Sequence, residues 1–92
     1  MAVCNYHGMG LPSEPQTLTP EQVAELNSKL SEMRHDINNY LSMVIAATEL
    51  VKRKPESADR FLEMIALQPP RITAEMQAFS TEFEKMLKIE RE

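Results

Sequence analysis

The sequence contains no tryptophan, only two glycines and a single cysteine. One cysteine cannot form an internal disulfide framework. A chain poor in glycine and rich in Glu, Leu, Ala, Met and Lys favours helices over sheets. No apolar run approaches the roughly 20 residues needed to cross a bilayer, and the amino-terminal residues lack the basic stretch and apolar core of a signal peptide. We therefore expect an all-α, soluble, cytoplasmic protein.

Positive and negative charges are mixed along the chain. The formal net charge is −4, and lysines and arginines are interspersed among the acidic residues. This distribution argues against a nucleic-acid surface, which needs a concentrated basic patch. With 92 residues the chain has room for one domain and buries only a modest part of its surface when it folds alone. Oligomerisation is therefore an early expectation.

Residues 1–18 contain glycines and prolines without apolar periodicity, which predicts a flexible N-terminal tail. Cys4 and His7 are three residues apart, a spacing that suits two metal ligands. Two ligands do not make a site, and no second pair follows. We predict no metal site and no intrinsic cofactor.

The first predicted helix spans about residues 20–54. Thr19 is suited to cap it, Pro20 to occupy its first position and Gln22 to complete a capping box, while Pro55 ends it. Apolar residues follow at alternating spacings of three and four: Val23, Leu26, Leu30, Met33, Ile37, Tyr40, Val44, Ala47 and Val51. This heptad pattern is typical of a coiled-coil or helix-bundle seam.

The second predicted helix spans about residues 57–90 and carries a similar series. Its members are Ala58, Leu62, Ile65, Pro69, Ile72, Met76, Phe79, Phe83 and Met86. Because the spacing continues through Pro69-Pro70, we expect a kink there that keeps the helix in phase. The short connection predicts an antiparallel two-helix hairpin. A hairpin alone leaves part of each apolar stripe exposed, so we predict a homodimer that forms a four-helix bundle.

His35 lies on the helix face opposite this seam. With Val23 at heptad position a, His35 falls at position f, and Asn39 follows one turn later on the same face. Ser42 and Ala46 continue that face with small side chains, which leave room for a docked protein.

These residues suit phosphoryl transfer better than metal binding, which needs more ligands. An exposed imidazole is partly neutral and nucleophilic near neutral pH. The adjacent Asp36 can orient one ring N–H, which leaves the other nitrogen free to attack. Asn39 can hydrogen-bond a transferred group or a water, and Arg34 favours an incoming phosphoryl group. The alternative is a solvated surface pair without chemistry.

The sequence His35-Asp36-Ile37-Asn38-Asn39, with Arg34 before it and Leu41 and Glu49-Leu50 after it, resembles the H-box of sensor histidine kinases. The resemblance is to their HisKA-like dimerisation and histidine-phosphotransfer domain, a helical hairpin that dimerises into a four-helix bundle. It implies that His35 is the phosphorylated residue and that Asp36 assists its phosphorylation. It also implies that Asn39 helps to position water for removing phosphate from a response regulator of two-component signalling.

The resemblance further implies a docking surface for the receiver domain of that response regulator. The residues expected to contact the partner are Arg34, Asn38, Ser42, Met43 and Ala46. Any Mg²⁺ is expected in the acidic pocket of the receiver domain.

The sequence also departs from this family. Tyr40 stands where many members have proline, and Pro69-Pro70 is unusual in the second helix. No Gly-rich nucleotide lid and no Asn-bearing Mg²⁺ motif follow, so we do not expect autophosphorylation from ATP. Four functions stay open: a phosphotransfer protein (a histidine phosphotransferase), a substrate for a histidine kinase catalytic domain, a docking inhibitor without chemistry, and a structural dimeric hairpin.

Overall fold

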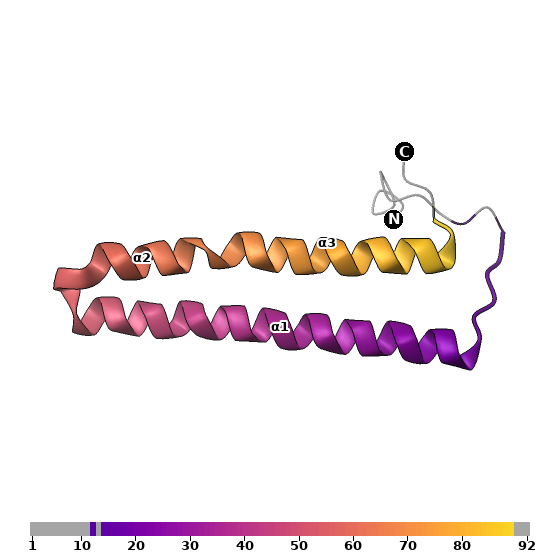
Figure 1. Cartoon of the computed structure of the whole chain (residues 1–92), viewed down its shortest axis with the longest axis horizontal. Coiled ribbons are helices and arrows are strands. Elements are labelled where there is room, and N and C mark those ends of the chain that lie inside the picture. Colours follow the sequence, from indigo (N-terminus) through magenta and orange to yellow (C-terminus); the bar gives the residue numbers. More distant parts are fainter. Residues whose placement is uncertain (1–11, 13, 90–92) are drawn as a thin grey trace, which may run out of the picture.

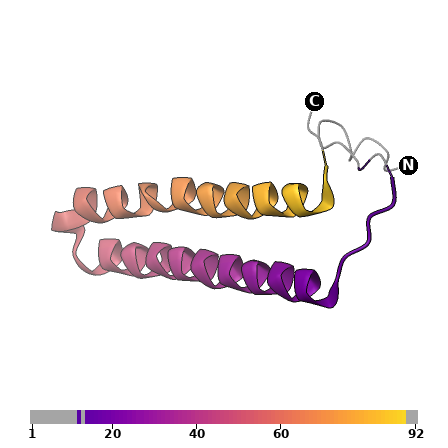
Figure 2. The same ribbon diagram turned by 45° about the vertical axis from the view of Figure 1, so that its right-hand side comes forward.

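The computed structural model describes residue 12 and residues 14–89, and this part of the chain is helical without strands. Its elements are α1 (Pro20–Arg53), η2 (Pro55–Ser57), α2 (Ala58–Ala66) and α3 (Gln68–Leu87). Helix α1 runs antiparallel to α2 and α3, which follow one another along its length (Figure 1). The turned view shows the same two layers side by side, with α1 as the first layer and α2 and α3 as the second (Figure 2). The prediction of an all-α protein is confirmed for these residues.

The expected N-terminal tail lies mostly outside the described residues, as do Cys4 and His7. The described part of that segment has no regular secondary structure before Pro20. Within the residues that are described, no helix combines the length and apolarity required to cross a membrane.

Both ends of α1 are stabilised by the residues that the sequence pointed to. The Gln22 backbone N–H donates to Thr19 Oγ1 at 3.1 Å, and the Thr19 N–H donates to Gln22 Oε1 at 2.8 Å. These two bonds form the capping box and satisfy amide groups that have no partner inside the helix. At the other end the Lys54 N–H donates to Leu50 O at 2.8 Å. Pro55 follows and cannot continue the hydrogen-bond pattern.

The two prolines interrupt the second layer without changing its direction. Pro69 and Pro70 lie in the first turn of α3, where a missing N–H leaves no intrahelical bond unmade. Leu67 keeps helical backbone angles of φ −76° and ψ −19° between α2 and α3. Its N–H is shared between Glu63 O at 3.2 Å and Met64 O at 3.3 Å. The break is therefore a single residue, and the second layer stays in phase across it.

Three rows of residues describe how the two layers meet. The central row consists of Leu26, Met33, Tyr40 and Ala47 on α1 and of Ile65, Ile72, Phe79 and Met86 opposite. The groove row lies three residues later in each case: Lys29, Asp36, Met43 and Leu50, with Gln68, Glu75 and Glu82. The outer row lies three residues earlier: Val23, Leu30, Ile37 and Val44, with Leu62, Pro69, Met76 and Phe83.

The hairpin covers the central row and part of the groove row, but leaves much of the outer row exposed. Ala47 and Gln68 are buried, with 1% and 3% of their surface exposed. The rest of the central row is half-buried. In the outer row, by contrast, Val23, Leu62 and Met76 each expose about half of their surface.

Within one hairpin the apolar series of the second helix is only partly covered. Leu62, Pro69, Met76 and Phe83 are exposed, in line with the expectation that a hairpin alone leaves part of each apolar stripe exposed. The positions beside the central row are taken instead by Gln68, Glu75 and Glu82, which are buried or half-buried. The apolar series is thus centred to one side of the contact between the two layers. Ile37 and Val44, which belong to the predicted heptad series of the first helix, are half-buried within one hairpin.

Candidate functional site

His35 projects from the middle of α1, with 74% of its side chain exposed. Its Nδ1 lies 3.5 Å from Asp36 Oδ1, at the outer limit of a hydrogen bond. When Nδ1 carries the proton and donates to Asp36, the lone pair of the ring is on Nε2. The pair therefore leaves Nε2 as the nucleophilic nitrogen on an open surface.

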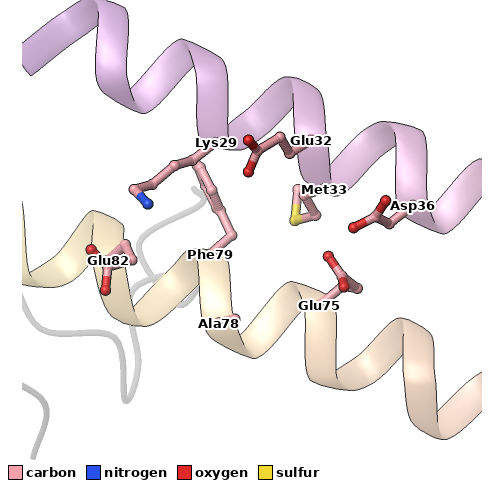
Figure 3. Close-up of a pocket in the computed structure, with 8 residues that line it drawn as sticks. All are labelled: Lys29, Glu32, Met33, Asp36, Glu75, Ala78, Phe79 and Glu82. Carbon is pink, nitrogen blue, oxygen red and sulfur yellow. The ribbon is translucent and has the colours of Figure 1, made fainter.

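Asp36 is less exposed than its neighbour, at 42% of its side chain. It belongs to the groove row and points toward α3, where the carboxyl group of Glu75 faces it (Figure 3). Both side chains line the same groove, and the interaction with Asp36 is one of the causes that raise the pKa of Glu75. Asp36 thus contacts His35 along α1 and Glu75 across the hairpin.

Asp36 and Glu75 line one end of a groove of about 130 Å³ between α1 and α3. The other lining residues are Lys29, Glu32, Met33, Ala78, Phe79 and Glu82. Four of the lining side chains are acidic and one is basic, so the groove is negatively charged overall. Its floor is apolar, since Met33 and Phe79 belong to the central row.

The surroundings of Glu75 favour its protonated form. Half-burial in the groove, the charge of Asp36 and the hydrogen bond to Asp36 raise the pKa of Glu75 above its ordinary value. The charge of Glu32 adds a smaller contribution in the same direction. In its protonated form Glu75 has an O–H group that can donate to the Asp36 carboxylate.

The structure exposes Asn39, Ser42 and Ala46 together with His35. They follow His35 by one, two and three turns of α1 and therefore share its face. Asn39 is the nearest of them, so its amide can reach a group bound at His35 Nε2. Ser42 and Ala46 continue this face with small side chains.

The other residues expected to contact a partner lie on both edges of this face. Arg34 and Asn38 are exposed on the edge that leads to the outer row. The Arg34 guanidinium donates to Ser31 Oγ at 3.4 Å, one turn before it. Met43 lies on the opposite edge, in the groove row, with 44% of its surface exposed. The expected site residues are therefore spread over one broad side of α1.

Tyr40, at the position where many members of the resembled family have proline, joins the two layers. It is half-buried in the central row, and the Arg71 guanidinium carbon lies 6.0 Å from the centre of its ring. This distance is at the limit of a cation–π contact. The helix around His35 is uninterrupted, since α1 continues to Arg53.

Glu75 is the residue of this site that sequence reasoning missed. A signal for it does exist, because polar side chains recur every seven residues at Gln68, Glu75 and Glu82. This row runs beside the apolar row of Ile65, Ile72 and Phe79 and thus marks a second face turned toward α1. The predicted seam used the row on the other flank and left Glu75 outside it.

Among the described residues, no group of three or more His, Cys, Asp and Glu side chains is arranged to hold a metal ion.

Comparisons with models of known protein families, with curated proteins and with solved structures each find no match to this chain. The function is therefore argued from the geometry of the site and from the H-box resemblance.

Proposed function

We propose that this protein is a histidine phosphoacceptor that exchanges a phosphoryl group with the aspartate of a response-regulator receiver domain. The observation that carries the proposal is the placement of His35. Its imidazole is exposed on an uninterrupted helix, and Asp36 lies against Nδ1, so that Nε2 is turned outward. The same segment provides the resemblance to the H-box.

The proposed transfer is a displacement at phosphorus. The lone pair of His35 Nε2 forms a bond to the phosphorus of the receiver's aspartyl phosphate, and the bond from phosphorus to the aspartate oxygen breaks. The aspartate leaves as a carboxylate. The imidazole ring becomes positively charged as this bond forms. The hydrogen bond from Nδ1–H to Asp36 stabilises that charge, and transfer of the Nδ1 proton to the Asp36 carboxylate removes it. The reverse sequence returns the phosphoryl group, and Mg²⁺ belongs to the receiver domain in both directions.

The proposed partner surface is the face of α1 around and below His35. Ser42 and Ala46 leave room for a docked domain, and Met43 offers an exposed apolar contact at its edge. Arg34 adds a positive charge near the phosphoryl group, and Asn38 and Asn39 add hydrogen-bonding groups. Asn39 is the residue placed to hold a water for removal of phosphate from the partner.

We propose further that two copies of the hairpin pair through the outer row. This row contains no charged residue on either layer, although Val23, Leu30, Leu62, Met76 and Phe83 are exposed there. Exposed apolar residues repeated over several heptads are typical of an interface between helices.

The geometry of an antiparallel pair places both halves of the outer row on one side of the hairpin. Each half precedes the central row of its own layer by three residues, which is the same rotation about each helix axis. In antiparallel helices that face one another, equal rotations turn both rows toward the same side. A second copy, related by a twofold axis, covers this side and completes a four-helix bundle. His35 then remains on the outside of each copy.

Phosphoryl transfer from a panel of phosphorylated receiver domains tests the proposed function. The wild type and His35→Gln are compared, with the radioactive label followed through acid and base treatment. The expected result is an acid-labile, base-stable label on the wild type and none on His35→Gln. A receiver that loses its phosphate while the wild-type protein gains no stable label would indicate a phosphatase. In that case Asn39→Ala should abolish the loss of receiver phosphate.

Two other outcomes would contradict the proposal and favour the remaining candidates. Binding to a receiver or to a kinase catalytic domain without any transfer indicates a docking inhibitor. Neither binding nor transfer across the panel indicates a structural hairpin.

A further inference from the structure

Three side chains form a chain of contacts that crosses from one layer to the other. His35 Nδ1 lies 3.5 Å from Asp36 Oδ1, and Asp36 lines the same groove as Glu75 of α3. Figure 3 shows the carboxyl groups of Asp36 and Glu75 pointing toward one another across the groove. Asp36 therefore sits between the nucleophile and a residue of the opposite helix.

This arrangement needs a restraint, because neighbouring residues on a helix do not face each other. Asp36 follows His35 directly, so its carboxylate must be held on the His35 side of α1 to reach Nδ1. With 42% of the side chain exposed, the packing around Asp36 alone leaves it rotational freedom. Glu75 faces Asp36 from α3, on the far side of the groove that both residues line (Figure 3).

We propose that Glu75 is a positioning residue for the His35 site: by donating a hydrogen bond to Asp36 across the hairpin, it holds that carboxylate against His35 Nδ1. The proposal rests on the proposed function, because it assigns Glu75 a role in the reactivity of the same histidine. Glu75 itself contacts neither the phosphoryl group nor the nucleophilic nitrogen.

The restraint depends on a proton. A protonated Glu75 donates to Asp36, whereas an ionised Glu75 repels it. The other charged groups around Glu75 are Glu32 and Lys29 on α1, which line the same groove, and Glu82 and Arg71 on α3. The charge of Glu32 favours protonation of Glu75, and the cations Lys29 and Arg71 oppose it. Asp36 is therefore held most firmly at mildly acidic pH and released as the pH rises through the pKa of Glu75.

Two substitutions at Glu75 separate the hydrogen bond from the charge. In Glu75→Gln the amide N–H donates to Asp36 at every pH, and in Glu75→Ala nothing donates. Glu82→Gln is the matched control. It removes the same charge from the same groove one heptad later, beside Lys85 (Nζ to Oε2 4.0 Å) and away from Asp36.

Phosphoramidate supplies a phosphoryl donor that requires no partner protein. His35 Nε2 forms a bond to its phosphorus, the P–N bond breaks, and the leaving nitrogen takes a proton and departs as ammonia. The rate of His35 labelling is measured from mildly acidic to mildly alkaline pH for the wild type and the three variants. Comparison of the variants at equal pH removes the effect of pH on the donor.

The tautomer ratio of the His35 imidazole gives a second readout that is independent of transfer. It is obtained from the ¹⁵N shifts of the ring, which are assigned by comparison with His35→Gln because the sequence contains a second histidine. Asp36 held against Nδ1 favours the tautomer that is protonated there. Far-UV circular dichroism establishes that each variant keeps its helices.

The expected result is a different pH dependence for each variant. Glu75→Gln should match the wild type at acidic pH and exceed it roughly tenfold at alkaline pH, within the ~100-fold that a 1 Å misplacement of a catalytic group can cost. Glu75→Ala should be slower than Glu75→Gln throughout and should lose the Nδ1–H tautomer preference. Glu82→Gln should follow the wild type in both readouts.

The proposal is overturned if Glu75→Ala keeps both the tautomer ratio and the labelling rate of Glu75→Gln. It is also overturned if Glu82→Gln changes them as much as the Glu75 variants do, because general groove charge would then explain the effect. Failure of the proposed function looks different: no variant, the wild type included, is labelled at His35, while the tautomer ratio still responds to Glu75.

Discussion

The side-chain amide of Gln68 donates a hydrogen bond of 2.8 Å to the backbone carbonyl of Met64, across the junction between α2 and α3. Gln68 is buried at the start of α3, with 3% of its surface exposed. Its other amide atom, Oε1, is buried and has no hydrogen-bond partner within the described part of the chain. One end of this side chain thus stabilises the junction while the other end carries a desolvation cost.

We therefore expect Gln68→Leu to leave the hairpin as stable as the wild type or up to about 1 kcal/mol more stable. An unsatisfied buried polar atom costs about 1–3 kcal/mol, and a typical hydrogen bond contributes about 0.5–1.5 kcal/mol. In the variant Met64 O should still accept the hydrogen bond from the Leu67 N–H, which measures 3.3 Å in the wild type. Urea denaturation measures the difference. A loss of more than about 1 kcal/mol would show that the Gln68 hydrogen bond is essential to the junction.

The stability of the hairpin should fall as the pH rises through the range in which Glu75 ionises. The pKa of Glu75 is raised in the folded state, so the folded protein holds this proton more tightly than the unfolded chain. The stabilisation is complete below the unfolded pKa and is lost as the pH rises through the folded pKa. Denaturation from about pH 4 to pH 8 should show this loss in the wild type relative to Glu75→Gln. Parallel curves for the two proteins would contradict the prediction, and Glu82→Gln should keep the wild-type slope.

A charge in the outer row should separate the two copies of the proposed dimer. Met76 lies in the outer row, whereas Met64 lies on the other side of the second layer. In one hairpin the two residues have similar exposed fractions, 52% for Met76 and 41% for Met64. Met76→Asp places an unpaired charge in the dimer interface and should weaken association by roughly 3 kcal/mol or more, about 100-fold in Kd. Met64→Asp is the matched control and should leave association unchanged. Sedimentation equilibrium measures both, and a wild type that is monomeric while fully helical would refute the four-helix bundle.

Loss of the N-cap should destabilise the start of α1. Thr19→Ala removes the acceptor for the Gln22 N–H, and such substitutions cost about 0.5–2 kcal/mol. Thr19→Ser keeps the hydroxyl group and should retain most of that stability. Thermal denaturation followed by circular dichroism compares the variants. Equal melting temperatures for Ala and Ser would show that the capping box contributes nothing measurable.

The sequence predicted the ends of α1 well, because helix termini depend on local chemistry. Thr19, Pro20 and Gln22 act within one turn, and Pro55 stops the helix by lacking an N–H. The exposed position of His35 was predictable for a similar reason. Heptad spacing places it opposite the apolar series whichever partner covers that series.

Glu75 was not predictable in the same way. Its contact with Asp36 depends on how far α3 slides along α1 and on which flank of the second layer faces the first. The shift of α3 along α1 and the flank that faces α1 both depend on the length of the turn at η2 and on the packing of Met33 and Phe79. The local spacing of apolar residues predicts neither of them.

What the sequence by itself determined is a pair of helices, their caps, their antiparallel order and the solvent-facing position of His35, since each follows from local hydrogen bonding and apolar period. Only the tertiary structure decided which row beside the central one lies between the layers. The physical reason is that an apolar stripe wider than one helix contact can turn either flank inward. Here the hairpin encloses Asp36 with Glu75 on one flank and leaves Leu30 and Met76 exposed on the other.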